Sequence, residues 1–93
     1  MERPEPIREY TITPHAIFEM QRRELDEVLI RGVLEGPEQR SSIRPGRDVL
    51  QSRLEVGDRE FLVRVFVDVD RVPAEVVTAY RTSKIDKYWR TET

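Results

Sequence analysis

His15 is the only histidine in the chain, and it stands in the sequence Thr13-Pro14-His15-Ala16. Thr13 is a favourable N-cap and Pro14 is favourable at the first helical position, so this segment predicts the first turn of a helix. The positive end of the helix dipole disfavours a protonated imidazole there. A neutral imidazole can accept a proton near neutral pH. If the protein performs acid–base chemistry, His15 is therefore the first candidate for the base.

The composition excludes several other kinds of chemistry. The 93 residues include no cysteine, so disulfide bonds, thiolate nucleophiles and Cys/His zinc sites are excluded. Asp68 and Asp70 share a face of a predicted strand, but no third ligand accompanies them, so we expect no metal and no cofactor. No segment approaches the roughly 20 apolar residues of a membrane span, and the first residues lack the apolar run of a signal peptide. We expect a cytoplasmic protein without membrane contact.

The charged residues are unevenly distributed, although the net charge is only −2. Residues 1–38 carry nine acidic and five basic side chains, whereas residues 39–64 carry four acidic side chains and six arginines. Fourteen of the 16 basic residues are arginine, whose forked guanidinium suits bidentate contacts with phosphate. A general bias toward arginine would give the same count, so composition does not separate the two explanations.

Two helices are predicted in the first half of the chain. The first covers residues 14 to about 22. The second begins near Leu25, with Asp26 as its cap, and ends at Gly36-Pro37. The side chains expected to point inward are Ile17, Phe18, Met20, Leu25, Val28, Leu29 and Val33.

Strand patterns occupy most of the remaining chain. Residues 38–44 are a weak candidate, and residues 48–56 and 60–70 form a hairpin that turns at Gly57-Asp58. A last strand over residues 74–81 places Val76, Thr78 and Tyr80 on one face. A short helix follows, capped by Thr82 or Ser83 and carrying Ile85, Tyr88 and Trp89.

These elements predict an α+β fold. Two N-terminal helices would pack on one face of an antiparallel meander of three to four strands, followed by a short C-terminal helix. Residues 1–9, which contain Pro4 and Pro6, are expected to be a flexible lead-in, and residues 10–93 a single domain.

Several short segments resemble one family of small bacterial proteins. They are residues 10–16 with His15 and Ala16, Met20, residues 23–25, and the closing sequence Val77-Thr78-Ala79-Tyr80. Together they are similar, over residues 10–88, to the proteins grouped as domain of unknown function 4258. That family in turn resembles the barnase, EndoU, colicin and RelE (BECR) assemblage of small ribonucleases, many of which are toxins of toxin–antitoxin pairs.

The resemblance implies an RNA-cleaving domain and a set of catalytic residues. His15 matches the family's helical histidine, Arg23 its arginine at the second helix boundary, and Thr78 and Tyr80 its polar pair on the last strand. The chain also departs from the family's pattern, because Glu19 replaces an arginine and Glu24 replaces a glycine.

Metal-free RNA cleavage needs a base for the 2′-hydroxyl, cations for the phosphorane and an acid for the 5′-oxygen. We assign His15 as the base, Arg23 as a cation, and Tyr80, beside Thr78, as a proton donor or phosphate-orienting group. The residues expected to contact phosphate are Arg22, Arg81, Lys84 and Lys87. Each assignment has a structural alternative: a surface or capping histidine, arginines that interact with a helix dipole, ordinary strand residues, and a solvated helix face.

The leading hypothesis is a metal-independent endoribonuclease-like toxin domain, similar to mRNA interferases and held in check by a cognate antitoxin-like protein. The alternative is a non-catalytic interaction module that kept the fold and lost the ribonuclease site. Glu19, Glu24 and the net acidity favour this alternative, because carboxylates repel RNA. Such a module would bind another protein or form a homodimer.

Overall fold

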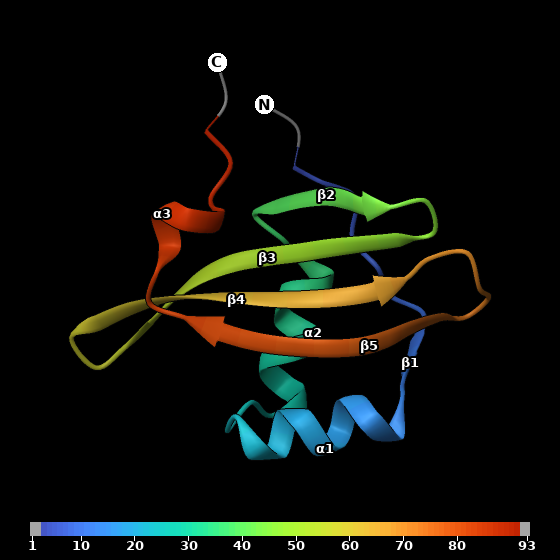
Figure 1. The fold of residues 1–93 in the computed structure, drawn as a ribbon, viewed down its shortest axis with the longest axis horizontal. Helices are drawn as coiled ribbons and strands as arrows, with labels where there is room; N and C mark the ends of the chain where they lie inside the picture. The colour runs from blue at the N-terminus through green and yellow to red at the C-terminus, as the bar shows by residue number, and fades with distance from the viewer. Residues whose placement is uncertain (1–2, 92–93) are drawn as a thin grey trace.

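The fold is a five-stranded sheet with three helices, in a computed structural model that describes residues 3–91 (Figure 1). Residues 1–2 of the expected lead-in and residues 92–93 of the expected domain lie outside the described part. The strands are β1 (Tyr10–Ile12), β2 (Gln39–Arg44), β3 (Arg47–Val56), β4 (Arg59–Asp68) and β5 (Ala74–Thr82). The helices are α1 (Pro14–Arg22), α2 (Glu27–Glu35) and α3 (Ile85–Tyr88).

The strand order in the sheet is β1-β5-β4-β3-β2. Strands β2 to β5 form the expected antiparallel meander, and the α+β class is confirmed. The expected number of strands, three to four, is wrong, because β1 adds a fifth strand that runs parallel to β5. A three-residue edge strand is too short to leave a periodic apolar pattern in the sequence. Gly46 and Gly57 adopt positive φ angles of 86° and 63° at the two hairpin turns, where glycine is the least strained residue.

Helix α1 has the expected caps but not the expected buried face. The Thr13 side chain accepts a hydrogen bond from the Ala16 N–H, and Pro14 is the first helical residue. Ala16 and Met20 are buried, whereas Ile17 is 37% and Phe18 is 58% exposed, so their predicted inward orientation is wrong. The reason is the position of α1 beside the edge of β5 (Figure 1), where one narrow stripe of the helix is covered.

Helix α2 packs across one face of the sheet (Figure 1). Asp26 caps it as expected by accepting the Leu29 N–H, and the helix ends at Gly36. Ile30, Val33 and Leu34 are buried, but Val28 is 72% exposed, so its inward placement in the prediction is wrong. The buried face that the sequence pattern predicted for α2 is therefore rotated by part of a helical turn from the observed one.

The two faces of the sheet have different environments. Alternate residues of β4 point to opposite faces, and Val63, Val65 and Val67 form the core beneath α2. Leu62, Arg64 and Phe66 lie on the other face, which we call the outer face. The pairing of β3 and β5 with β4 places Gln51, Thr78 and Tyr80 on the outer face too.

A register shift in β5 divides the residues that the sequence pattern placed together. Tyr80 pairs with Arg64 and Thr78 pairs with Phe66, but Val76 pairs with Val67. Val76 is therefore buried in the core, and its predicted position on the face of Thr78 and Tyr80 is wrong. An extra residue at a β-bulge reverses the alternation on either side of it.

The segments at both ends of the described chain are attached to the domain. Ile7 is buried, and its N–H donates to the Leu34 carbonyl. The N-cap of α3 is Lys84, so the N-cap predicted at Thr82 or Ser83 is wrong, but the Thr82 hydroxyl accepts a hydrogen bond of 3.0 Å from the Lys84 N–H. The chain after α3 contacts β2, where the Gln39 amide donates to the Arg90 carbonyl and accepts from the Arg90 N–H.

None of the helices among the described residues is long and apolar enough to span a membrane.

Candidate functional site at the edge and outer face of the sheet

Arg23 and Thr78, which the sequence analysis assigned to one site, are in contact. Arg23 follows the last turn of α1, and its Nη1 donates to the Ala79 carbonyl at 2.8 Å and to the Thr78 hydroxyl at 3.3 Å. Its Nη2 lies 3.6 Å from a carboxylate oxygen of Glu19. We call Glu19, Arg23, Thr78 and Ala79 the edge cluster. It joins α1 to the free edge of β5.

Glu19 neutralises both arginines of this helix end. Its side chain is only 12% exposed, and its second oxygen lies 2.7 Å from Arg22 Nη1. Arg22 itself is exposed and lies beside the Phe18 ring. The glutamate therefore stands where the resemblance led us to expect a phosphate-facing arginine, and it holds Arg23 against the strand.

Tyr80 belongs to a second group of side chains, on the outer face. Its hydroxyl accepts a hydrogen bond of 2.7 Å from Arg64 Nη1, and Arg64 Nε donates to Gln51 Oε1 at 2.9 Å. The Arg64 guanidinium lies 4.3 Å from the centre of the Tyr88 ring. We call Gln51, Arg64, Tyr80 and Tyr88 the outer-face cluster.

Gln51 fixes the orientation of the Arg64 guanidinium in this cluster. It is 2% exposed and is the one buried polar side chain among the described residues. Its amide nitrogen donates to Gln39 Oε1 at 2.8 Å and to the Tyr88 carbonyl at 3.2 Å, so its oxygen is left to accept from Arg64. A buried amide with every bond satisfied has one preferred orientation, and it fixes the guanidinium in turn.

Arg64 differs from the other arginines in its partners. Its side-chain hydrogen bonds both go to neutral groups. Within residues 3–91, every other arginine side chain that forms a hydrogen bond or ion pair contacts a carboxylate. The positive charge of Arg64 is therefore not compensated by a contacting carboxylate, and two bonds leave three of the five N–H donors of a guanidinium for another acceptor.

Tyr88 completes the outer-face cluster with a perturbed hydroxyl. A side-chain hydrogen bond with Tyr80, and a second one with Lys87, lower the pKa of Tyr88 below the usual value for tyrosine. The charges of Lys87 and Arg64 act in the same direction. A phenol with a lowered pKa releases its proton more readily, which suits an acid–base role.

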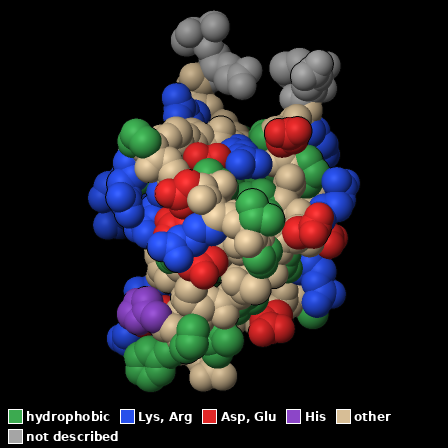
Figure 2. All heavy atoms as spheres, turned by 90° about the vertical axis from the view of Figure 1, so that its right-hand side faces the viewer, with side chains coloured by type: hydrophobic (Ala, Val, Ile, Leu, Met, Phe, Trp, Pro, Cys, Tyr) green, Lys and Arg blue, Asp and Glu red, His purple; other side chains and the backbone are tan. Residues whose placement is uncertain are grey.

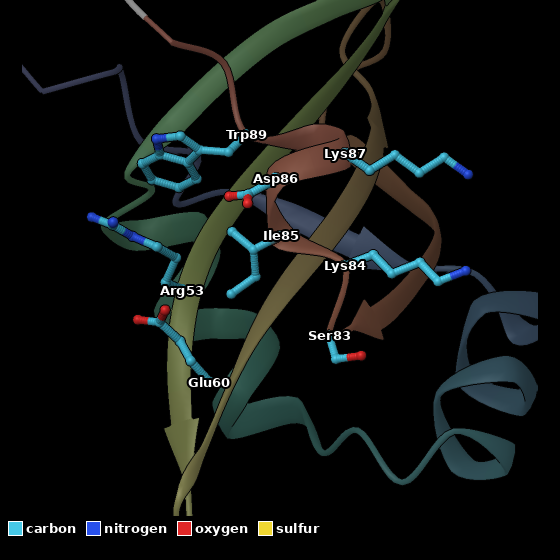
Figure 3. Close-up of a pocket in the computed structure, with 8 residues that line it drawn as sticks. All are labelled: Arg53, Glu60, Ser83, Lys84, Ile85, Asp86, Lys87 and Trp89. Carbon is cyan, nitrogen blue, oxygen red and sulfur yellow. The ribbon is translucent and has the colours of Figure 1, made fainter.

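The remaining predicted residues lie at different places. His15 is exposed in the first turn of α1, and Figure 2 shows the histidine in purple at the surface. Arg81 pairs with Val63 in the register, so it lies on the face opposite Tyr80, 3.8 Å from a Glu24 carboxylate oxygen. Lys84 and Lys87 border a groove beside α3 (Figure 3).

The sequence analysis missed Arg64, Gln51 and Tyr88 as members of a site. The alternation in β4 already placed Arg64 among apolar residues on the face opposite the valines. Extending the hairpin register from Gly57-Asp58 would have paired Arg64 with Gln51. The contact with Tyr88 depends on the course of the chain after β5, which no local pattern reveals.

The carboxylates form no metal centre in the part of the chain that the structure describes. Residues 3–91 contain no cluster of three metal-ligating side chains. Asp68 accepts hydrogen bonds of 2.7 Å and 3.2 Å from Arg47, and this pairing lowers the pKa of Asp68.

Comparison with known proteins identifies one relationship. The family described as Domain of unknown function (DUF4258) matches residues 12–81. No curated protein matches the chain. No solved structure matches it either. The matched span contains the edge cluster and all of the outer-face cluster except Tyr88.

Proposed function

Because the chain belongs to the family Domain of unknown function (DUF4258) and carries the outer-face cluster, we propose that it is a metal-independent endoribonuclease-like domain. The resemblance of this family to the BECR ribonuclease toxins is part of the proposal. The observation that carries it is Arg64, a fixed guanidinium with neutral partners that contacts the Tyr80 hydroxyl and lies over the Tyr88 ring. A phosphate is the anion for which such an arginine is best suited.

The reaction would be transesterification at a phosphodiester. A base removes the 2′-hydroxyl proton, the 2′-oxygen bonds to phosphorus, and the bond from phosphorus to the 5′-oxygen breaks as that oxygen gains a proton. The products are a 2′,3′-cyclic phosphate and a 5′-hydroxyl, so no water is consumed in this step. The protein has to stabilise the phosphorane and to move two protons.

Arg64 would stabilise the phosphorane, because its unused N–H groups can donate to the extra negative charge. Its orientation is fixed before substrate binds, so little reorganisation accompanies the reaction. Tyr88, whose pKa is lowered by its hydrogen bonds with Tyr80 and Lys87, would protonate the leaving 5′-oxygen. His15 stays the predicted base for the 2′-hydroxyl.

The proposal is tested by incubating the purified chain with RNA in the presence of a chelator. The expected products are fragments with 2′,3′-cyclic phosphate ends, and the Arg64→Met variant should form them far more slowly. His15→Ala should also abolish cleavage and any growth arrest on expression if the imidazole is the base. Absence of cleavage on every RNA tried, with and without a ribosome, would contradict the proposal.

The second candidate is a non-catalytic interaction module, which the edge cluster favours. Arg23, the arginine expected to face phosphate, is occupied by Glu19 and by the Ala79 carbonyl. In the toxin proposal, the partner is an antitoxin-like protein that inhibits RNA cleavage. In the module proposal, the partner is bound without any RNA cleavage, and removal of the Arg64 side chain changes no RNA-dependent activity.

A further inference from the structure

A groove of about 670 Å³ lies between α3 and the β3–β4 hairpin (Figure 3). Two side chains of its wall form a stacked pair, because the Arg53 guanidinium lies 4.1 Å from the centre of the Trp89 ring. Glu38 holds Arg53 in this position by accepting a hydrogen bond of 3.0 Å from its Nη2. The pair repeats the arrangement of Arg64 over Tyr88.

The groove and the outer-face cluster contain residues that are close to one another in the sequence. Trp89 directly follows Tyr88, and Arg53 lies two residues after Gln51 on the same face of β3. Gln51 contacts both Arg64 and the Tyr88 carbonyl. The groove and the outer-face cluster are therefore built from neighbouring residues of β3 and of the segment around α3.

The charges around the groove suit a nucleotide with its phosphate on one side. Figure 3 shows the Lys84 and Lys87 side chains extending together, away from Trp89 and Arg53. Asp86 points to the same side as Trp89, and Glu60 lies beyond Arg53. Lysines attract the phosphate backbone, whereas carboxylates repel phosphate and can only accept hydrogen bonds, for example from the N–H groups of a base edge.

We propose that this groove binds one unpaired nucleotide of single-stranded RNA, with its base stacked on the Arg53–Trp89 pair. The proposal rests on the proposed function and deepens it, because it names the part of the substrate that is held beside the cleaved bond. Unstacked bases bind to aromatic rings and to guanidinium planes. Guanine fits best, because its Watson–Crick edge presents adjacent N–H groups to Asp86, whereas uracil presents one N–H between two carbonyls.

Trp89 is the only tryptophan, so its fluorescence reports directly on the groove. The test titrates the full chain with 2′-O-methyl tetranucleotides, which cannot be cleaved because the attacking hydroxyl is blocked. We expect saturable quenching that is about tenfold tighter for a guanine-containing oligonucleotide than for an all-uracil one. Asp86→Asn should remove this preference while the binding of the uracil oligonucleotide stays unchanged.

An abasic oligonucleotide of equal length and an oligoglutamate peptide are the controls for charge alone. If either one quenches Trp89 as tightly as the guanine oligonucleotide, the groove binds anions without reading a base, and the proposal is overturned. Trp89→Phe should retain guanine-dependent binding in a competition assay, whereas Trp89→Leu should lose about tenfold in affinity. Equal binding by both variants would also overturn it.

The two proposals fail in different ways in these experiments. Quenching without any RNA cleavage would contradict the proposed ribonuclease activity and support a groove that binds single-stranded RNA. Cleavage without any quenching would support the proposed ribonuclease activity and contradict the binding of a nucleotide in the groove.

Discussion

The edge cluster and the outer-face cluster each contain an arginine that reaches β5, but the two arginines have different partners. Arg23 contacts a carboxylate and a backbone carbonyl, so its charge is balanced within the fold. Arg64 contacts a glutamine, a tyrosine hydroxyl and three aromatic rings but no carboxylate, so its charge is not balanced by an opposite charge. The difference teaches that two arginines beside the same strand can differ in the charge they offer to a ligand, because the partners decide what a guanidinium can do.

The largest expected effect is on catalysis at Arg64. Arg64→Met should lower the rate of RNA cleavage by about 100-fold or more, because it removes the donors aimed at the phosphorane. The measurement is a single-turnover cleavage assay. Arg59→Met removes the same charge from an exposed position of the same strand and should retain most of the activity. Equal losses of cleavage rate in Arg64→Met and Arg59→Met would show that only the overall charge of the protein matters.

The next effect concerns proton transfer by the tyrosines. Tyr88→Phe should slow cleavage by about 100-fold if this phenol is the general acid. Tyr80→Phe should raise the pKa of Tyr88, because it removes the first of the hydrogen bonds that lower it. An ultraviolet difference titration of the tyrosinate band measures that pKa. A Tyr88 pKa that does not move in Tyr80→Phe would show that the hydroxyl pair is not coupled.

Arg23 should show the opposite profile to Arg64. Arg23→Met should destabilise the fold by about 2 kcal/mol, because the Ala79 carbonyl and Glu19 lose a charged partner. The cleavage rate of the folded fraction should stay within about threefold of the wild type. Arg22→Met, which removes the other and exposed partner of Glu19, is the matched control and should cost less than about 1 kcal/mol. Urea unfolding gives both free energies.

The smallest expected effect is the pH dependence of stability at Asp68. Arg47 lowers the pKa of Asp68 in the folded state. The resulting stabilisation is fully present above the unfolded pKa, near 4, and is lost as the pH falls through the lower folded pKa. Asp68→Asn should remove this acid-sensitive part, within about 1 kcal/mol, and leave cleavage unchanged. The unfolding free energies of the two proteins should differ by a constant amount above about pH 4, and this difference should shrink as the pH falls below that value.

Local chemistry made much of the fold predictable. The caps Thr13 and Asp26, the stop at Gly36 and the hairpin turn at Gly57 each depend on one or two neighbouring residues, and each is present in the structure. The short parallel strand β1 was missed because its pairing with β5 joins segments that are far apart in the sequence.

The candidate sites were less predictable from the sequence, because their contacts also join segments that are far apart in the chain. Arg23 and Thr78, two residues that the resemblance assigned to one site, are in contact, but the role of Glu19 in fixing Arg23 depends on the side chain's orientation. The register shift in β5 moved Val76 away from Thr78 and Tyr80, since a bulge breaks the period on which face assignments rest. Arg64 joins Tyr88 only because the chain turns back over the outer face after β5.

The central claim is that the uncompensated charge of Arg64, rather than Arg23, receives the RNA phosphate. The most direct measurement follows the Nε–Hε NMR resonances of both arginines while a 2′-O-methyl RNA tetranucleotide is added. We predict a saturable shift of the Arg64 resonance and an unchanged Arg23 resonance. A shift at Arg23 with none at Arg64 would contradict the account and return the phosphate site to the edge of the sheet.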